Sequence, residues 1–253
     1  MPSLRPFPLL LSGLLTAGIG VAAIPGSEAA PVSAALLQAL ETALNARDDA
    51  PLAALLREGP GLEPLQLKQR RQRLRQAFPD LSWQVKAGPP QSDGQPSVLI
   101  ATTGTRVQDG TSYRLDAQQI LSLESDGRQI SGQAVLSETS LLRSGEKAVP
   151  VVLQAPDAVL TGQRYDVDLI VDEPLDGALL AGGIAAVSAE QVAAMQSPSL
   201  ELGALGGGGL FKTVRAPLTP GLQTWALLLV HPRGVVTATK RVRVVSDRRA
   251  LAP

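Results

Sequence analysis

The chain of 253 residues is 44% hydrophobic, and its 23 basic and 23 acidic residues leave a formal net charge of zero, so no long-range field favours nucleic acid or an anionic membrane. It has no cysteine, which excludes disulfides, thiolate metal sites and a cysteine nucleophile. The single histidine, His231, excludes most zinc geometries and any histidine-based triad in the N-terminal half.

Residues 1–30 have the layout of a secretory signal peptide. Arg5 precedes an apolar run from Leu9 to Ala23 that is short for a membrane span, and small residues around Ser27 suit cleavage. An uncleaved membrane anchor is the alternative. We therefore expect an exported protein, in the periplasm or, in a photosynthetic bacterium, in the thylakoid lumen.

Three helices are predicted before residue 78, over residues 32–45, 49–57 and 63–77. Leucines at helical spacing mark the first, and Asp49 before Pro51 marks the start of the second. The third contains a basic run, which we interpret as its solvated face rather than as an anion-binding surface. The run consists of Lys68, Arg70, Arg71, Arg73 and Arg75.

Segments that alternate apolar and polar residues follow, separated by turns at Gly94, Gly110 and Gly127. They predict four antiparallel strands between residues 82 and 145. Three helices followed by such a sheet indicate an α+β domain over residues 31–146, in which the helices pack on one face of a curved sheet.

Two motifs carry a resemblance to a known superfamily. Residues 78–85 read Phe-Pro-Asp-Leu-Ser-Trp-Gln-Val, and residues 126–130 read Asp-Gly-Arg-Gln-Ile. With the order of elements, they make residues 32–145 similar to the nuclear transport factor 2-like superfamily, and within it to the SnoaL-like group. The resemblance implies a cone-like sheet around a pocket, which some members use for acid–base chemistry and others only for binding.

Strand alternation indicates which side chains would line the mouth of such a pocket: Trp83, Tyr113, Gln119 and Glu138. A buried Glu138 would have a raised pKa and could act as a general base. The alternative is that Glu138 lies in solvent past the sheet edge and that Gln119 makes a structural hydrogen bond. No catalytic residue is transferred from the superfamily, because its catalytic members generally pair a carboxylate with a histidine or another acid–base partner.

Residues 147–246 predict an all-β domain. They are rich in valine and leucine and are interrupted by proline or glycine every ten or so residues. An immunoglobulin-like β-sandwich is the expected closure, with the strand around 225–230 in a central position and Pro232–Gly234 as a hairpin turn. Residues 247–253 are expected to form a disordered tail.

Three further features of this part are candidates for a metal-binding or phosphate-binding site. Asp166, Asp168 and Asp172 alternate along one strand and are weak calcium candidates, since period-two acids also describe the wet side of a strand. The glycine run 206–209 lacks the residues of a phosphate-binding loop. His231 is interpreted as a strand-end residue.

These observations favour an exported, non-enzymatic binding protein with a pocketed N-terminal domain and no metal or cofactor. Its partner would be a protein or a small apolar ligand, and we expect no binding to nucleic acid. It would contact a membrane only through an uncleaved signal segment. A homodimer is left open. The alternative is a small-molecule isomerase, cyclase or hydrolase that acts in the N-terminal pocket.

Overall fold

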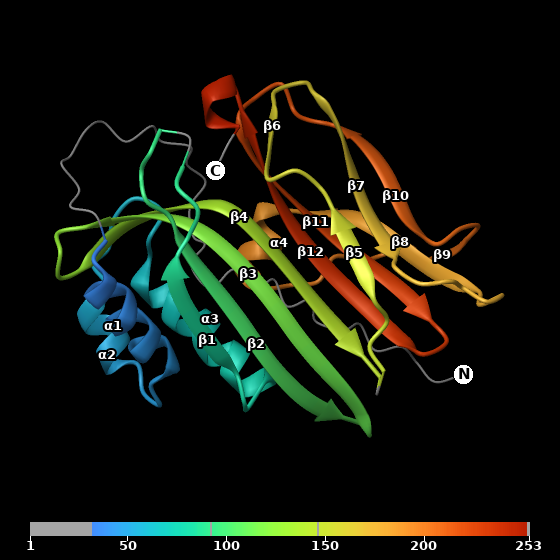
Figure 1. Ribbon diagram of the computed structural model, residues 1–253, viewed down its shortest axis with the longest axis horizontal. Helices are drawn as coiled ribbons and strands as arrows, with labels where there is room; N and C mark the ends of the chain where they lie inside the picture. Colours follow the sequence, from blue (N-terminus) through green and yellow to red (C-terminus); the bar gives the residue numbers. More distant parts are fainter. Residues whose placement is uncertain (1–31, 92, 146, 252–253) are drawn as a thin grey trace.

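A computed structural model describes residues 32–91, 93–145 and 147–251 (Figure 1). Of the described residues, 49% lie in strands and 19% in helices. The predicted fold class, helices packed on a cone-like sheet followed by a separate all-β sandwich, is therefore wrong. One large antiparallel sheet dominates the molecule instead, because a strand of the N-terminal part pairs directly with a strand of the C-terminal part.

The helices and strands form from the local signals in the sequence. Ser33 caps the first helix by accepting a hydrogen bond from the Leu36 N–H, and prolines occupy the first turns of the next two. The helices are α1 (Ala34–Asn45), α2 (Ala50–Leu55), α3 (Pro64–Ala77) and α4 (Ala189–Ala194). The strands are β1 (Ser82–Ala87), β2 (Val98–Gln108), β3 (Thr111–Ser125), β4 (Ile130–Ser144), β5 (Val151–Gln154), β6 (Ala158–Leu160), β7 (Arg164–Val171), β8 (Leu180–Val187), β9 (Gly203–Leu205), β10 (Gly209–Arg215), β11 (Gly221–His231) and β12 (Gly234–Val245).

The large sheet has the strand order β1-β2-β3-β4-β12-β11-β8-β9, and β6 adds to β12 in parallel. The second sheet has the order β10-β7-β5. β4 and β12 join the two halves of the large sheet through six residue pairs, from Glu138 opposite Arg241 to Arg143 opposite Val236. The hairpin of β11 and β12, and the central position of β11, are confirmed.

Two hydrophobic clusters pack on opposite faces of the large sheet. Leu142 belongs to the cluster under α1–α3, whereas its neighbour Leu141 packs against the cluster between the two sheets. Consecutive strand residues point to opposite faces, so the helices cover one face and the second sheet covers the other. We call the face under α1–α3 the helix face. Figure 1 shows the helices beside β1–β4 and the second sheet beside β11 and β12.

The predicted domain boundary at residue 146 stays a prediction. The large sheet contains strands from both sides of this position. The predicted signal peptide, residues 1–30, lies outside the described residues. The C-terminal residues continue as a 3₁₀ turn, Arg248–Ala250, whose last carbonyl accepts a hydrogen bond from Arg243 Nη1.

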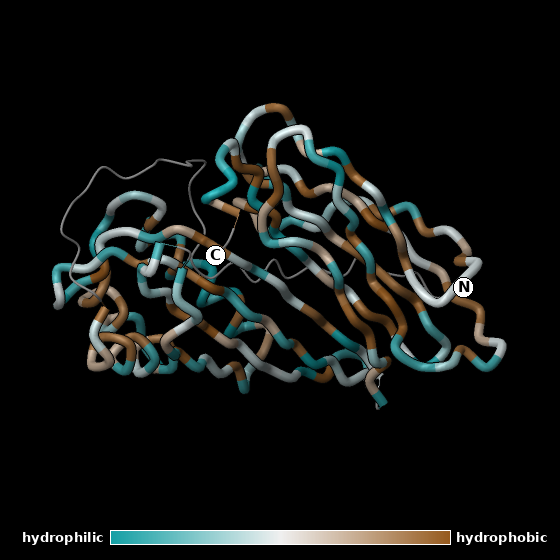
Figure 2. Tube along the Cα trace, turned by 45° about the horizontal axis from the view of Figure 1, so that its top comes forward, coloured by the Kyte–Doolittle hydropathy of each residue, from teal (hydrophilic) through white to brown (hydrophobic). Residues whose placement is uncertain are grey.

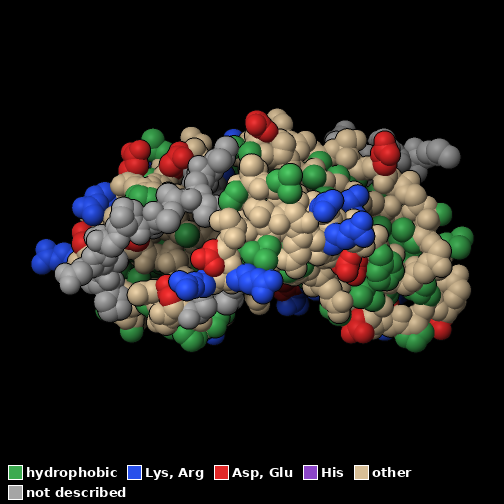
Figure 3. Space-filling view, turned by 90° about the horizontal axis from the view of Figure 1, so that it is seen from above, with side chains coloured by type: hydrophobic (Ala, Val, Ile, Leu, Met, Phe, Trp, Pro, Cys, Tyr) green, Lys and Arg blue, Asp and Glu red, His purple; other side chains and the backbone are tan. Residues whose placement is uncertain are grey.

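The surface has no dominant charge on the face seen from above, where Lys and Arg side chains lie among Asp and Glu side chains (Figure 3). Hydrophobic stretches follow the packed strands of the C-terminal part (Figure 2). Within the described ranges, no helix combines the length and the apolar character needed to cross a membrane.

Side chains of α1 cap the free edge of β1. Asn45 accepts a hydrogen bond from the Trp83 N–H (3.1 Å) and donates one to the Trp83 carbonyl (2.7 Å), as a neighbouring strand would. Glu41 accepts a third from the Val85 N–H at 2.7 Å. An edge strand with unpaired backbone groups invites pairing with other chains, so α1 both packs on the sheet and closes this edge.

We expect Asn45→Ala to lower the free energy of unfolding by about 1–2 kcal/mol, because it removes two hydrogen bonds of ordinary strength. It also leaves one backbone N–H and one carbonyl of β1 without these partners, so aggregation on heating should increase. Urea unfolding and light scattering measure the two effects. Gln38→Ala, at an exposed position of the same helix, is the matched control, and an equal loss in both variants would contradict the capping role.

Candidate functional site

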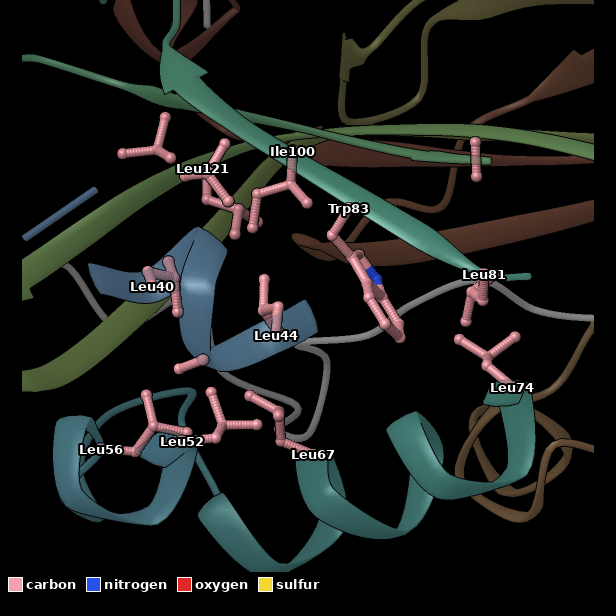
Figure 4. Packing of buried hydrophobic residues seen from close by; sticks show 14 of the residues in the cluster. Leu40, Leu44, Leu52, Leu56, Leu67, Leu74, Leu81, Trp83, Ile100 and Leu121 are labelled. Carbon is pink, nitrogen blue, oxygen red and sulfur yellow. The ribbon is translucent and has the colours of Figure 1, made fainter. Parts of the chain in front are cut away.

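The four predicted pocket residues all lie on the helix face, but none lies at an open mouth. Trp83 is 1% exposed, Gln119 and Glu138 are 3% exposed, and Tyr113 is 9% exposed. Trp83 points from β1 toward the helices and packs among leucines of α1 and α3 (Figure 4). The structure brings Gln119 and Glu138 together as direct cross-strand neighbours on β3 and β4, and Tyr113 lies near the far end of β3.

A buried polar cluster surrounds Glu138 at the seam between the two halves of the sheet. Arg241, its neighbour on β12, has Nε 3.2 Å from Glu138 Oε2, and both side chains are almost fully buried. Arg70 of α3 is also buried nearby; burial lowers the pKa of its guanidinium, the charge of Glu138 opposes this effect, and the charge of Arg241 adds to it. The carboxylate is therefore held as the counter-ion of buried arginines, not left as a free base.

Further polar pairs connect β4 and β12 on both faces of the sheet. On the helix face, the hydroxyls of Ser140 and Thr239 form a buried hydrogen bond of 2.5 Å. On the opposite face, Lys240 forms an ion pair with Asp157, which also accepts a hydrogen bond from Ser137 Oγ. The seam is consequently more polar than the cores on either side of it, and its polar groups fix the register of the two strands.

The basic run of α3 is not simply a solvated face, so that interpretation is wrong. Arg71 is 1% exposed; its Nε donates to the Leu44 carbonyl at 3.0 Å, and its guanidinium also reaches the Ala46 carbonyl and Asp49. Arg75 Nη2 donates to the same Leu44 carbonyl at 3.1 Å. These cations satisfy carbonyls at the C-terminal end of α1, where the helix dipole is negative.

Arg71 and Arg75 also flank Trp83, with guanidinium carbons 5.9 and 5.2 Å from the ring centre. Cation–π contacts at these distances stabilise a buried ring next to charged groups. The indole of Trp83 is therefore part of the packing of α3 against the sheet, and only a small fraction of it is open to a ligand.

The second helix begins at Asp49 as predicted, but Asp49 makes no capping hydrogen bond with its side chain. Its carboxylate binds Arg71 and Gln72 of α3 instead. Burial alone would raise the pKa of Asp49, but the hydrogen bond from Gln72 and the charges of Arg71 and Lys68 outweigh it and lower the pKa.

A second cluster lies at the end of the sheet where β2 finishes and β3 begins. Arg106 is half-buried, and its guanidinium carbon lies 5.2 Å from the ring centres of both Phe78 and Tyr113. Phe78 reaches this position because it packs directly over Gly104, where an added Cβ would lie 3.0 Å from the Cβ of Phe78. We call Phe78, Arg106 and Tyr113 the arginine sandwich.

A small hollow adjoins the arginine sandwich through Tyr113, and its other lining residues are Leu142, Val235 and Thr237. Its volume is about 10 Å³, close to what one water molecule needs. The aliphatic side chains of Leu142 and Val235 make it largely apolar. Of the predicted site residues, Tyr113 is the one that lines this hollow.

The weak calcium candidates lie on or beyond β7. Asp166 accepts a hydrogen bond from Thr213 Oγ1 at 2.7 Å, Asp168 accepts one from the Lys212 N–H at 3.3 Å, and Asp172 follows the end of the strand. In the described part of the chain, no group of three or more His, Asp or Glu side chains is arranged to hold a metal ion. His231 accepts a hydrogen bond from the Arg233 N–H in the β11–β12 turn.

Arg70, Arg106 and Arg241 were not among the predicted site residues. Strand alternation could have identified Arg106, because it lies on the same face of β2 as the buried Ile100 and Gly104. Arg241 carried none without knowledge of the pairing of β4 with β12.

Residues 146–245 match a family described as a domain of unknown function (DUF8623). The match covers less than half of the chain and includes β5–β12 and Arg241, whereas Arg70, Gln119 and Glu138 lie outside it. No curated protein matches the chain. The polar cluster therefore joins a residue of the matched segment to residues outside it.

We expect Glu138→Gln to lower the free energy of unfolding by about 3–5 kcal/mol, because it leaves Arg241 buried without its counter-ion. The double change Glu138→Leu with Arg241→Met should recover part of this loss, since it removes both buried charges together. Urea unfolding measures both variants. Arg57→Met, which breaks an exposed pair with Asp126 at 3.9 Å, is the control and should change stability by less than about 1 kcal/mol.

The lowered pKa of Asp49 predicts a loss of stability in acid. A carboxyl whose pKa in the folded state is below its ordinary value of 3.8 stabilises the fold above that value, and this contribution is lost as pH falls through the folded-state pKa. Asp49→Asn should therefore be less stable than wild type at pH 7, and the difference should shrink between pH 4 and pH 2. Urea midpoints across this range measure it, with Asp109→Asn in an exposed turn as control; a difference that does not depend on pH would contradict the assignment.

Proposed function

We propose that this protein is an exported, non-enzymatic binding protein that holds a small apolar ligand at the arginine sandwich and the hollow beside it. The observation that carries the proposal is the placement of Glu138, the one carboxylate that strand alternation nominated as a general base. It is 3% exposed and paired with Arg241, so a substrate has almost no access to it.

A general base must come within hydrogen-bond reach of the proton that it removes. Glu138 Oε2 lies 3.2 Å from Arg241 Nε beneath α3, and the neighbouring Gln119 is equally buried. Using Glu138 in catalysis would require breaking a buried ion pair in every turnover, which is costly. These residues therefore support a structural role for the cluster and favour binding over catalysis.

The arginine sandwich and the hollow differ from the buried cluster around Glu138 in position, composition and exposure. They lie at an end of the sheet and combine two aromatic rings with aliphatic side chains, and Arg106 is half-buried whereas Glu138 is almost fully buried. Ligand sites in proteins are mostly apolar and carry a few polar groups that orient the ligand. The hollow has room for about one water molecule, so it would take at most the end of a short chain.

The resemblance of residues 32–145 to the nuclear transport factor 2-like superfamily agrees with a binding role, since many members of that superfamily only bind. Export to the periplasm or to the thylakoid lumen forms part of the same proposal and follows from the N-terminal signal pattern.

Methyl NMR tests the proposal with butan-1-ol and butyrate as probes. We expect saturable shifts of the Leu142 and Val235 methyl signals with at least one probe, while the methyls of Val107, which is 74% exposed on β2, move little. Equal, unsaturable shifts at all three residues would overturn the binding site. Hydrolysis of p-nitrophenyl butyrate that Glu138→Gln abolishes in a folded protein would overturn the non-enzymatic role.

A further inference from the structure

We infer that the arginine sandwich recognises a carboxylate, so that the ligand is a small apolar carboxylic acid whose acid group binds Arg106. The inference rests on the proposed function and specifies the chemistry of its site. Arg106 has two buried donors without acceptors, no carboxylate partner among the described residues, and two aromatic rings beside its guanidinium.

Two donor nitrogens of Arg106 are not used within the described structure. Its Nε and Nη2 are buried and have no hydrogen-bond partner among the described residues. These two nitrogens lie on the same edge of the guanidinium plane, and this edge matches the two oxygens of a carboxylate in a bidentate pair. A buried donor without an acceptor costs free energy. A hydrogen bond formed at this edge therefore contributes more binding free energy than one formed at an exposed arginine.

The charge of Arg106 is also uncompensated. Arg106 forms no ion pair with any Asp or Glu of the described chain, whereas Arg71 pairs with Asp49 and Arg233 pairs with Glu173. Burial lowers the pKa of the Arg106 guanidinium, which Tyr113 only partly offsets. Arg106 is therefore a partly desolvated cation without the carboxylate partner that Arg71 and Arg233 have.

The aromatic rings hold the guanidinium in place. Phe78 and Tyr113 both lie 5.2 Å from its carbon, so two cation–π contacts orient the planar fork that would pair with a carboxylate. Tyr113 is shared between the sandwich and the hollow, and the strand order places Leu142 on β4 and Val235 on β12 beyond Tyr113.

The test compares butyrate with butan-1-ol, two probes with the same four-carbon chain and different end groups. We expect butyrate to bind at least about tenfold more tightly and to shift the Nε–H signal of Arg106 in NMR spectra, because a charge-assisted bidentate pair is worth more than about 1.4 kcal/mol. Arg106→Gln should remove this preference, and Arg106→Lys should retain only part of it, because lysine keeps the charge but lacks the planar fork.

Arg114→Gln is the matched control. Arg114 lies on neighbouring β3, on the opposite face, with its side chain 66% exposed, and its removal should leave the preference for butyrate unchanged. Thermal unfolding and the NMR spectrum confirm that each variant is folded, and Arg106→Met provides a second neutral variant if Arg106→Gln does not fold.

The outcomes separate the two proposals. If both probes bind equally at the methyls of Leu142 and Val235, and Arg106→Gln changes neither, the carboxylate inference is overturned while the binding site stands. If neither probe gives saturable shifts there, the proposed function is overturned as well. If butyrate binds and its affinity falls equally in the Arg106 and Arg114 variants, the attraction is a general effect of charge and the inference is again overturned.

Discussion

The pairing of β4 with β12 is the constraint on which the rest of the structure depends. It places Glu138 opposite Arg241 and converts what would be two separate edges into the interior of one sheet. An exposed edge must be protected against association with other chains, and pairing removes the edge altogether. The seam is polar on both faces, and hydrogen-bonded polar pairs are sensitive to register, since a shift of one residue would move each of them to the wrong face.

Arginine side chains of α3 connect the helices to one another, although the sequence pattern predicts that they face solvent. Arg71 and Arg75 of α3 satisfy carbonyls at the end of α1, while Arg73 Nη1 donates to the Ala194 carbonyl near the end of α4. α3 therefore supplies positive charge to the negative ends of two other helices, one in each half of the chain. Because the cations also flank Trp83, the largest buried side chain of this region lies in an electrostatically defined position.

The sequence was sufficient to locate most elements but not to assemble them. Period-two alternation and turn residues indicated the long strands and the face to which Trp83 and Glu138 belong. The pattern does not say which strand lies beside another, and β4 and β12 are about a hundred residues apart in the chain. The separate sandwich was therefore predicted in place of a shared sheet, and the partner of Glu138 remained hidden. The role of the α3 arginines depended on the carbonyls of other helices, which no helical charge pattern reveals.

Glu138 and Arg106 differ in whether the described chain supplies a partner for their charge. Both are charged residues on the helix face of the sheet, where each would be costly without compensation. Glu138 is compensated from within the chain, by Arg241 at 3.2 Å, and its desolvated charge already has a partner. Arg106 has two aromatic rings but no anion from the described chain, and two of its buried donors lack acceptors. If the protein binds a ligand as proposed, Arg106, rather than the buried Glu138, is the residue whose unpaired donors and charge that ligand would satisfy.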